Sequence, residues 1–170
     1  LSNQLQIPVT ASAGHPDVVS SRHPLFAGQI GPRGNEVASL ATREADVILA
    51  IGTRLAFNTT FYTYNDINKD AKIVQIDIEP TALGKYFPID VGIIGDAGAV
   101  AGAIADGLSD MNANSVPWKA RSQQFIKALE ELWRSRDEDG KSTLTPLRPE
   151  RVFSELRQAA PDNMLFTLDA

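Results

Sequence analysis

The fold of this 170-residue chain is decided by four segments, GPRG (31–34), DVILAIGTR (46–54), KIVQIDIEP (72–80) and VGIIGD (91–96). The last three each contain a short apolar run that stops at a glycine or an aspartate. Runs that are solidly apolar, without alternation, are typical of parallel strands buried on both faces. The pattern therefore predicts an α/β fold with a mostly parallel sheet. Ligands of such sheets lie outside the carboxyl ends of the strands.

Composition narrows the class of protein. The length indicates one domain, with a fragment of another at most. The chain has no cysteine, which excludes disulfides, thiolate metal sites and a cysteine nucleophile. A net charge of −5 without any basic run argues against nucleic acid as a partner. There is no apolar run of the roughly 18 residues that a membrane span needs, and no signal peptide is visible. We expect a cytoplasmic protein.

Hydrophobic periodicity and turn residues outline the remaining elements. We expect helices at 1–6, 35–44, 97–111, 116–136 and 150–159, a helical turn at 80–83, and strands at 7–12 and 163–169. We expect loops at 14–31, 55–70 and 137–139, and a linker at 142–149. The only histidines, His15 and His23, fall in the first loop. A metal site would need more ligands than the residues around them offer. The GKS at 140–142 lacks the first glycine and the preceding strand of a phosphate-binding loop.

Three glycines precede the helix expected at 35–44. Gly28, Gly31 and Gly34 are spaced three apart, which is not the dinucleotide fingerprint G-x-G-x-x-G. Backbone amides at such a helix start could face an anion. The glycines could equally be turn formers only. The pattern leaves both interpretations open.

The residues at the strand ends also have two interpretations each. Arg54 could pair with a phosphate or be a solvated charge. Asp77 could accept hydrogen bonds from ribose hydroxyls, or lie as a charge before the helical turn at 80–83. Asp96 could cap the helix that follows it and contact a ligand as well.

Taken together, these blocks resemble a known family. From His23 to Asp96 the chain is similar to the central domain of thiamine-diphosphate-dependent enzymes, in the acetolactate synthase-like group. That group has a G-x-x-G loop, then a strand ending G-x-R, then I-D-I-(D/E)-P, then a strand ending G-D. Here these are 31–34, 52–54, 76–80 and 95–96. The tail from Leu147 to Asp169 looks like the opening of the family's diphosphate-binding domain.

The resemblance implies a domain organisation. Residues 1–145 would be a Rossmann-like, three-layer central domain with helices on both faces of the sheet, lacking its first strand. Residues 146–170 would begin the C-terminal diphosphate-binding domain. The family's catalytic glutamate and its diphosphate and Mg²⁺ motif would lie outside this chain, so we expect no catalytic and no metal-binding residue in it. The segment 164–169 could fill the place of the missing strand, in the same or a neighbouring chain.

The resemblance also implies a nucleotide site, because some family members bind FAD or an ADP moiety in this domain. The contacts carry over to Arg33, Gly34, Gly52, Thr53, Arg54, Asp77, Ile78, Gly95, Asp96 and Ala97. The amides of Gly34 and Asn35 would face the diphosphate. Family members that bind FAD follow G-x-R with an F-D-D-R-like run. Here the run at 55–58 is LAFN, which puts FAD in doubt.

Two functional hypotheses follow. The first is the central domain of a parent enzyme that uses thiamine diphosphate and Mg²⁺ on a 2-oxo acid or an aldehyde. Its partners would be the other domains of the parent and further copies in a homodimer or homotetramer. The second is a free-standing nucleotide-binding regulatory module or a sirtuin-like domain. A sirtuin-like enzyme would need a catalytic histidine in its own motif and commonly a four-cysteine zinc site, and the chain has neither.

Overall fold

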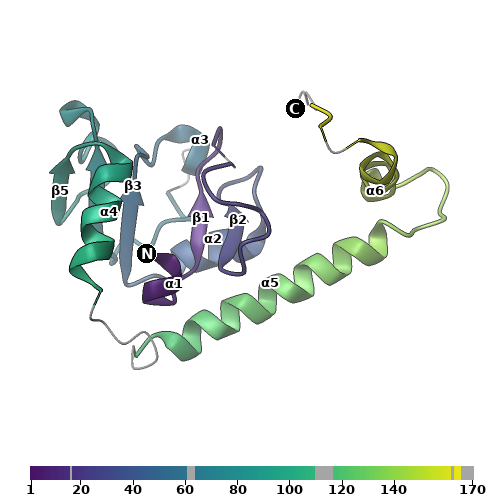
Figure 1. The fold of residues 1–170 in the computed structure, drawn as a ribbon, viewed down its shortest axis with the longest axis horizontal. Helices are drawn as coiled ribbons and strands as arrows, with labels where there is room; N and C mark the ends of the chain where they lie inside the picture. Colours follow the sequence, from purple (N-terminus) through teal and green to yellow (C-terminus); the bar gives the residue numbers. More distant parts are fainter. Residues whose placement is uncertain (16, 61–63, 110–116, 162, 166–170) are drawn as a thin grey trace. The chain divides into compact units, whose positions relative to one another are not determined.

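The computed structural model describes residues 1–15, 17–60, 64–109, 117–161 and 163–165. It divides into two units, Leu1–Ala128 and Leu129–Ala170. Figure 1 draws the elements of both. In chain order they are α1 (Ser2–Leu5), β1 (Val9–Ala11), β2 (Phe26–Gln29), α2 (Glu36–Arg43), β3 (Val47–Ile51), α3 (Phe57–Thr60), β4 (Lys72–Asp77), the 3₁₀ turn η1 (Pro80–Ala82), β5 (Val91–Ile94), α4 (Ala97–Gly107), α5 (Lys119–Asp139) and α6 (Pro149–Ala159).

The strands of the first unit form two sheets. β1 pairs with β2, and β3, β4 and β5 pair in that order. All three pairings are parallel, with Ala50, Gln75 and Gly92 in register across the larger sheet. The predicted parallel α/β fold is confirmed. Within the described residues, however, no strand joins β1 to β3, so the strands make two sheets.

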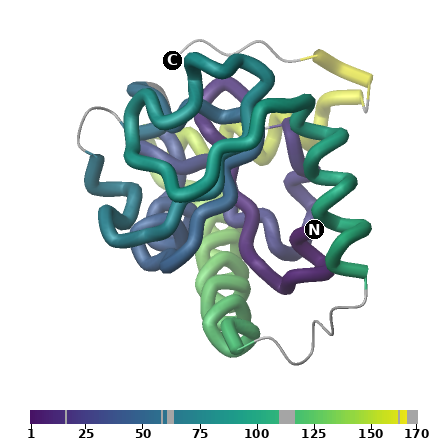
Figure 2. Tube along the Cα trace, turned by 90° about the vertical axis from the view of Figure 1, so that its left-hand side faces the viewer, coloured from purple at the N-terminus to yellow at the C-terminus, as the bar shows by residue number. Residues whose placement is uncertain are grey.

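One apolar core serves both sheets. It brings together Ala27 of β2, Ala38 of α2, Ala50 of β3 and Ile73 of β4, each at most 3% exposed. The N-terminal residues are fastened to the end of α4, where Gln4 Nε2 donates to the carbonyl of Ala105 at 2.9 Å. Figure 2 shows the N-terminus beside that helix. The two sheets and their helices therefore belong to one folded body.

The expectation that these strands are buried on both faces is wrong for the outer strands. Val47 of β3 is 57% exposed and Ile94 of β5 is 62% exposed. The apolar helix α4 buries none of its residues. Uninterrupted apolar runs indicate strands that other elements can bury on both faces. In the described part of the chain, those elements cover the outer strands only partly.

The segment 14–31 was expected to be a loop, yet it contains β2. Phe26 and Ala27 are buried there, but Gly28 interrupts the apolar signal. Gly28 has φ +99°, and a Cβ on it would lie 2.2 Å from Nδ2 of Asn35. That Asn35 nitrogen donates to the carbonyl of Ala27 at 2.7 Å. The glycine is thus needed so that the Asn35 side chain can reach β2.

The C-terminal helices match their predictions except at their ends. The acidic residues 137–139 were expected to be a loop, but they continue α5, and Gly140 N closes the helix on Arg136 O at 2.9 Å. Asp and Glu are compatible with a helix, and the glycine after them is the actual stop. α4 ends at Gly107, and residues 110–111 and 116 of the predicted helices lie outside the described residues. So does most of the strand predicted at 163–169.

α6 begins at Pro149, one residue before the predicted start at 150, and this proline lies in its first turn. Arg148 pairs with Asp139, and Arg151 pairs with Glu155 at 2.6 Å. Among the described helices, none combines the length and apolar character that crossing a membrane requires.

Candidate functional site

Three parallel strands end at one edge of the larger sheet. Gly52 follows β3, Asp77 ends β4 and Gly95 follows β5. Gly52 N donates to Ile76 O at 2.8 Å, and Gly95 N donates to Asp77 O at 3.1 Å. These bonds continue the ladder to its last residues. The strands that close at Gly52, Asp77 and Gly95 therefore end at one edge of the sheet, as parallel pairing requires.

The start of α4 closes this edge beside Gly52. Gly52 has φ +62°, and a Cβ on it would lie 3.5 Å from the Cβ of Ala97, the first residue of α4. Asp96 is the N-cap of that helix, and its Oδ1 accepts from Ala99 N at 2.9 Å. The capping role predicted for Asp96 is confirmed, and it places an exposed carboxylate next to the end of β3.

Asp77 has a local role that the sequence only partly indicated. The residue is 8% exposed, and its Oδ1 accepts from Glu79 N at 2.9 Å. The turn η1 is capped by Glu79 instead, whose Oε1 accepts from Thr81 N at 3.1 Å and from Thr81 Oγ1 at 2.9 Å. Ile78, between the two acids, is 71% exposed. The alternative role of Asp77, a charge at the start of this turn, thus belongs to Glu79.

The pKa of Glu79 depends on groups from two loops at this edge. Hydrogen bonds from the backbone and the side chain of Thr81 hold the pKa of Glu79 below its ordinary value, and the positive charge of Arg54 adds to that effect. Arg54 lies in the loop after β3 and Glu79 in the loop after β4. Arg54 and Glu79 thus bring a cation and a carboxylate from different loops to this edge of the sheet.

The loop after β2 behaves differently from the expectation. Gly34 N donates to Gly31 O at 2.8 Å, and Asn35 N donates to Gln29 O at 3.0 Å. A Cβ on Gly34 would lie 1.9 Å from Gln29 O. Both amides are engaged within the chain, so the prediction that they face a diphosphate is wrong. The glycines act as turn and packing residues here.

The predicted site residues therefore fall into two groups. One group lies at the ends of β3, β4 and β5: Gly52, Thr53, Arg54, Asp77, Ile78, Gly95, Asp96 and Ala97. Arg33 and Gly34 lie after β2, in the other sheet. The structure brings the first group to one edge and leaves the two others on a separate loop.

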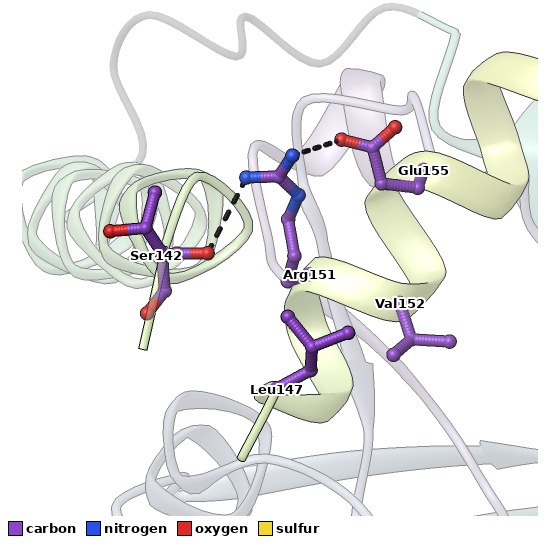
Figure 3. A pocket seen from close by; sticks show the side chains of 6 residues that line it. Ser142, Leu147, Arg151, Val152 and Glu155 are labelled. Carbon is purple, nitrogen blue, oxygen red and sulfur yellow. Dashed lines mark hydrogen bonds and ion pairs between the residues drawn. The ribbon is translucent and has the colours of Figure 1, made fainter. Parts of the chain in front are cut away.

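Two hollows lie away from these residues. One of about 480 Å³ lies at the opposite, amino end of the larger sheet, lined by Tyr64, Ile73, Phe87 and Asp90 among others. The second unit has one of about 380 Å³ beside Leu147, Arg151 and Val152 (Figure 3). Neither hollow includes a predicted site residue. In the parts of the chain that the structure describes, no three His, Asp or Glu side chains are grouped as metal ligands.

Gln75 is one residue of this edge that the sequence did not single out. It lies inside β4 and is 2% exposed, yet its amide bonds to the loops after both β3 and β4. The available signal was its polar side chain inside the run KIVQID, where the neighbouring strand residues are apolar. A buried glutamine in such a run must have partners nearby.

Comparison with known proteins gives a consistent result. The family model described as "Thiamine pyrophosphate enzyme, central domain" matches residues 1–104. The chain is 31% identical to the sulfoacetaldehyde acetyltransferase of Castellaniella defragrans, over 99% of this chain and 31% of that protein. It is 32% identical to the enzyme of the same name from Alcaligenes xylosoxydans xylosoxydans, over 99% of this chain and 32% of that protein. With a probable acetolactate synthase large subunit of Methanocaldococcus jannaschii it shares 32% identity, over 93% of this chain and 26% of that protein. The chain spans about a quarter to a third of the length of these three relatives.

Proposed function

Because the chain belongs to the family of thiamine pyrophosphate enzyme central domains, we propose that it is the central domain of a transferase or lyase acting on a 2-oxo acid or an aldehyde. The observation that carries this proposal is the identity of 31% and 32% to two sulfoacetaldehyde acetyltransferases, in each case over 99% of this chain. The similarity to a probable acetolactate synthase is compatible with the same chemistry. The similarity to these enzymes favours the central domain of a parent enzyme over a sirtuin-like domain or a free-standing regulatory module.

The cofactor chemistry belongs elsewhere in the parent. Within the described residues no cluster of acidic and histidine side chains fits a magnesium ion. The family resemblance puts the residues that would hold thiamine diphosphate and Mg²⁺ in other domains of the parent. What this chain contributes is the edge formed by β3, β4 and β5. The other domains of the parent would be its partners, in a cytoplasmic homodimer or homotetramer.

For that edge we propose the ADP portion of a nucleotide as the ligand. Gly52 leaves room for a close approach, and Arg54 supplies a positive charge for a phosphate. Asp77 and Asp96 each use Oδ1 in a backbone bond. A carboxylate has a second acceptor oxygen, and in Asp77 this oxygen would accept from the ribose, while Asp96 would lie near the adenine.

FAD fits the edge less well than ADP. The run at 55–58 stands where FAD-binding members of the family carry polar residues. Ala56 and Phe57 stand at the two aspartate positions of that run, and neither carries a carboxylate. These positions therefore lack the polar contacts to a flavin, which supports the smaller ligand.

Calorimetry with ADP, FAD and coenzyme A tests the proposal. ADP should bind, and Asp77→Ala or Arg54→Ala should each weaken it by roughly ten- to a hundredfold, as expected for losing a hydrogen bond to a charged group. Lys127→Ala, which removes an exposed charge of α5, is the control. Binding that is unaffected by the Asp77→Ala, Arg54→Ala double variant would overturn the site. If even the full-length parent binds none of these ligands, the edge serves only to hold the outer domains together.

A further inference from the structure

Gln75 is placed where two loops of the proposed nucleotide site meet the sheet. It lies in the central strand β4, in register with Ala50 of β3 and Gly92 of β5. Both neighbours are small, so they leave room for the Gln75 side chain on its face of the sheet, where it is 2% exposed. A buried amide of this kind must find its partners inside the protein.

The partners of the Gln75 amide come from both loops. Its Nε2 donates to the carbonyl of Thr53 at 3.0 Å, in the loop after β3. The same nitrogen reaches the carbonyl of Ala82 at 3.4 Å, in the loop after β4. Its Oε1 accepts from Gly84 N at 2.9 Å, further along that second loop. One side chain thus holds three backbone groups of two separate segments.

These loops carry the charges of the edge. Thr53 precedes Arg54, and Ala82 closes η1, which Glu79 caps. If the amide is removed, Thr53 O and Gly84 N lose this partner, whereas Ala82 O still accepts from Lys85 N at 3.5 Å. The two loops then share no hydrogen bond to the Gln75 side chain.

We propose that Gln75 is a positioning residue that fastens the loop after β3 to the loop after β4, and so holds Arg54 and the 77–84 segment in the arrangement that binds the nucleotide. The ligand part of this inference rests on the proposed function. The fastening itself rests on the three hydrogen bonds alone. Gln75 touches no ligand in this scheme and acts through Thr53, Ala82 and Gly84.

Two variants of the 170-residue chain test the proposal, with amide exchange at Gly84 and ADP affinity as the measurements. Gln75→Leu keeps the size but makes none of the three bonds. We expect Gly84 N–H to exchange at least tenfold faster and ADP to bind at least tenfold more weakly. Gln124→Glu, on the exposed face of α5, is the control and should change neither.

Gln75→Glu distinguishes the effect of the hydrogen bonds between the loops from the effect of side-chain packing. A neutral glutamic acid can donate to Thr53 O and accept from Gly84 N, whereas a carboxylate can donate to neither carbonyl. Burial favours the neutral form. A carboxylate still accepts from Gly84 N, so the effect of pH should appear in the loop after β3. Leu55 N–H, which donates to Thr53 Oγ1 at 3.3 Å, should be protected at acid pH and exchange faster as the pH rises. The wild-type profile over the same range accounts for the other charged groups nearby, which are Arg54, Asp77, Glu79, Lys85 and Asp96.

The outcomes distinguish the two proposals. Unchanged exchange at Gly84 in Gln75→Leu, or no pH-dependent recovery in Gln75→Glu, would overturn the fastening. Faster exchange with unaltered ADP affinity would overturn the positioning role. If the wild type does not bind ADP at all, the proposed nucleotide site fails, while the exchange and pH measurements still decide whether Gln75 joins the loops.

Discussion

Gly34 lies against backbone atoms that leave no room for a side chain. A Cβ there would lie 1.9 Å from Gln29 O and 2.6 Å from Gln29 C, which are backbone atoms at the end of β2. Gly34→Ala should therefore force β2 and the start of α2 apart and destabilise the fold by about 1–3 kcal/mol. Urea unfolding followed by circular dichroism measures the change.

Gly102 is the matched control for this substitution. It lies inside α4, and a Cβ on it would meet nothing within 4 Å. Gly102→Ala should stabilise the protein by roughly 0.5–1 kcal/mol, because alanine is the better helix former. Equal effects of the two substitutions would show that the close approach at Gly34 is not what matters.

The acid stability of the protein should depend on Glu79. Its folded pKa lies below the ordinary value of 4.5, first because of the hydrogen bonds from Thr81 and then because of Arg54. A lowered folded pKa contributes stability at pH values above about 4.5, and this is lost as the pH falls through the folded pKa. The stability difference between wild type and Glu79→Gln should thus be largest near pH 7 and shrink below about pH 4.5.

Thr81→Ala is the companion variant for this measurement. It removes the hydroxyl donor to Glu79 and keeps the backbone donor. Its pH dependence should fall between those of wild type and Glu79→Gln, as followed by unfolding at a series of pH values. Parallel curves for all three proteins would contradict the role given to Glu79.

At the scale of elements, β1 and β3 each have an edge that no other described strand pairs with. Val9 N and Ala11 O bond toward β2, and Gly52 N and Asp46 O bond toward β4. Since alternate residues of a strand point to opposite sides, the amides of residues 47, 49 and 51 point away from β4. Apolar edges of this kind recruit further strands.

We therefore keep the prediction that the segment 164–169 pairs with this edge, in the same or a neighbouring chain. Residues 166–169 lie outside the described residues. Deleting 161–170 should speed amide exchange at residues 47, 49 and 51, while residues 48 and 50, which face β4, serve as internal controls. Exchange that is unaltered at residues 47, 49 and 51 would mean that another segment, or none, covers the edge.

The elements that the sequence predicts correctly are marked by residues within the element or directly before it. Asn35 before an amphipathic run marks the start of α2, and Asp96 before small apolar residues marks the start of α4. β2 escaped prediction because Gly28 breaks its short run. The division into two sheets agrees with the resemblance, which implies a missing first strand and unpaired edges at 7–12 or 46–51. Local sequence signals alone do not indicate it, because it depends on which edges pair across distant parts of the chain.

The candidate site, too, could be predicted from the sequence only in part. Convergence of the three strand ends follows from parallel runs that each stop at Gly or Asp. The roles of Asp77, Glu79 and Gly34 depend on bonds formed two to five residues away in folded loops. Two glycine readings were equally compatible with the sequence, and only the hydrogen bonds of the Gly34 and Asn35 amides decided between them.

At the scale of the whole molecule, we predict that this chain alone has no catalytic activity. It spans about a third or less of its relatives named above. The family resemblance puts the activating glutamate and the diphosphate motif in other parts of the parent. An assay with pyruvate, thiamine diphosphate and Mg²⁺ should give product no faster than buffer, because nothing here would activate the cofactor. A full-length acetolactate synthase relative, assayed in parallel, shows that the conditions support turnover. Product formation by the 170-residue chain that is lost in Asp77→Ala would instead place catalytic machinery at the edge of β3, β4 and β5.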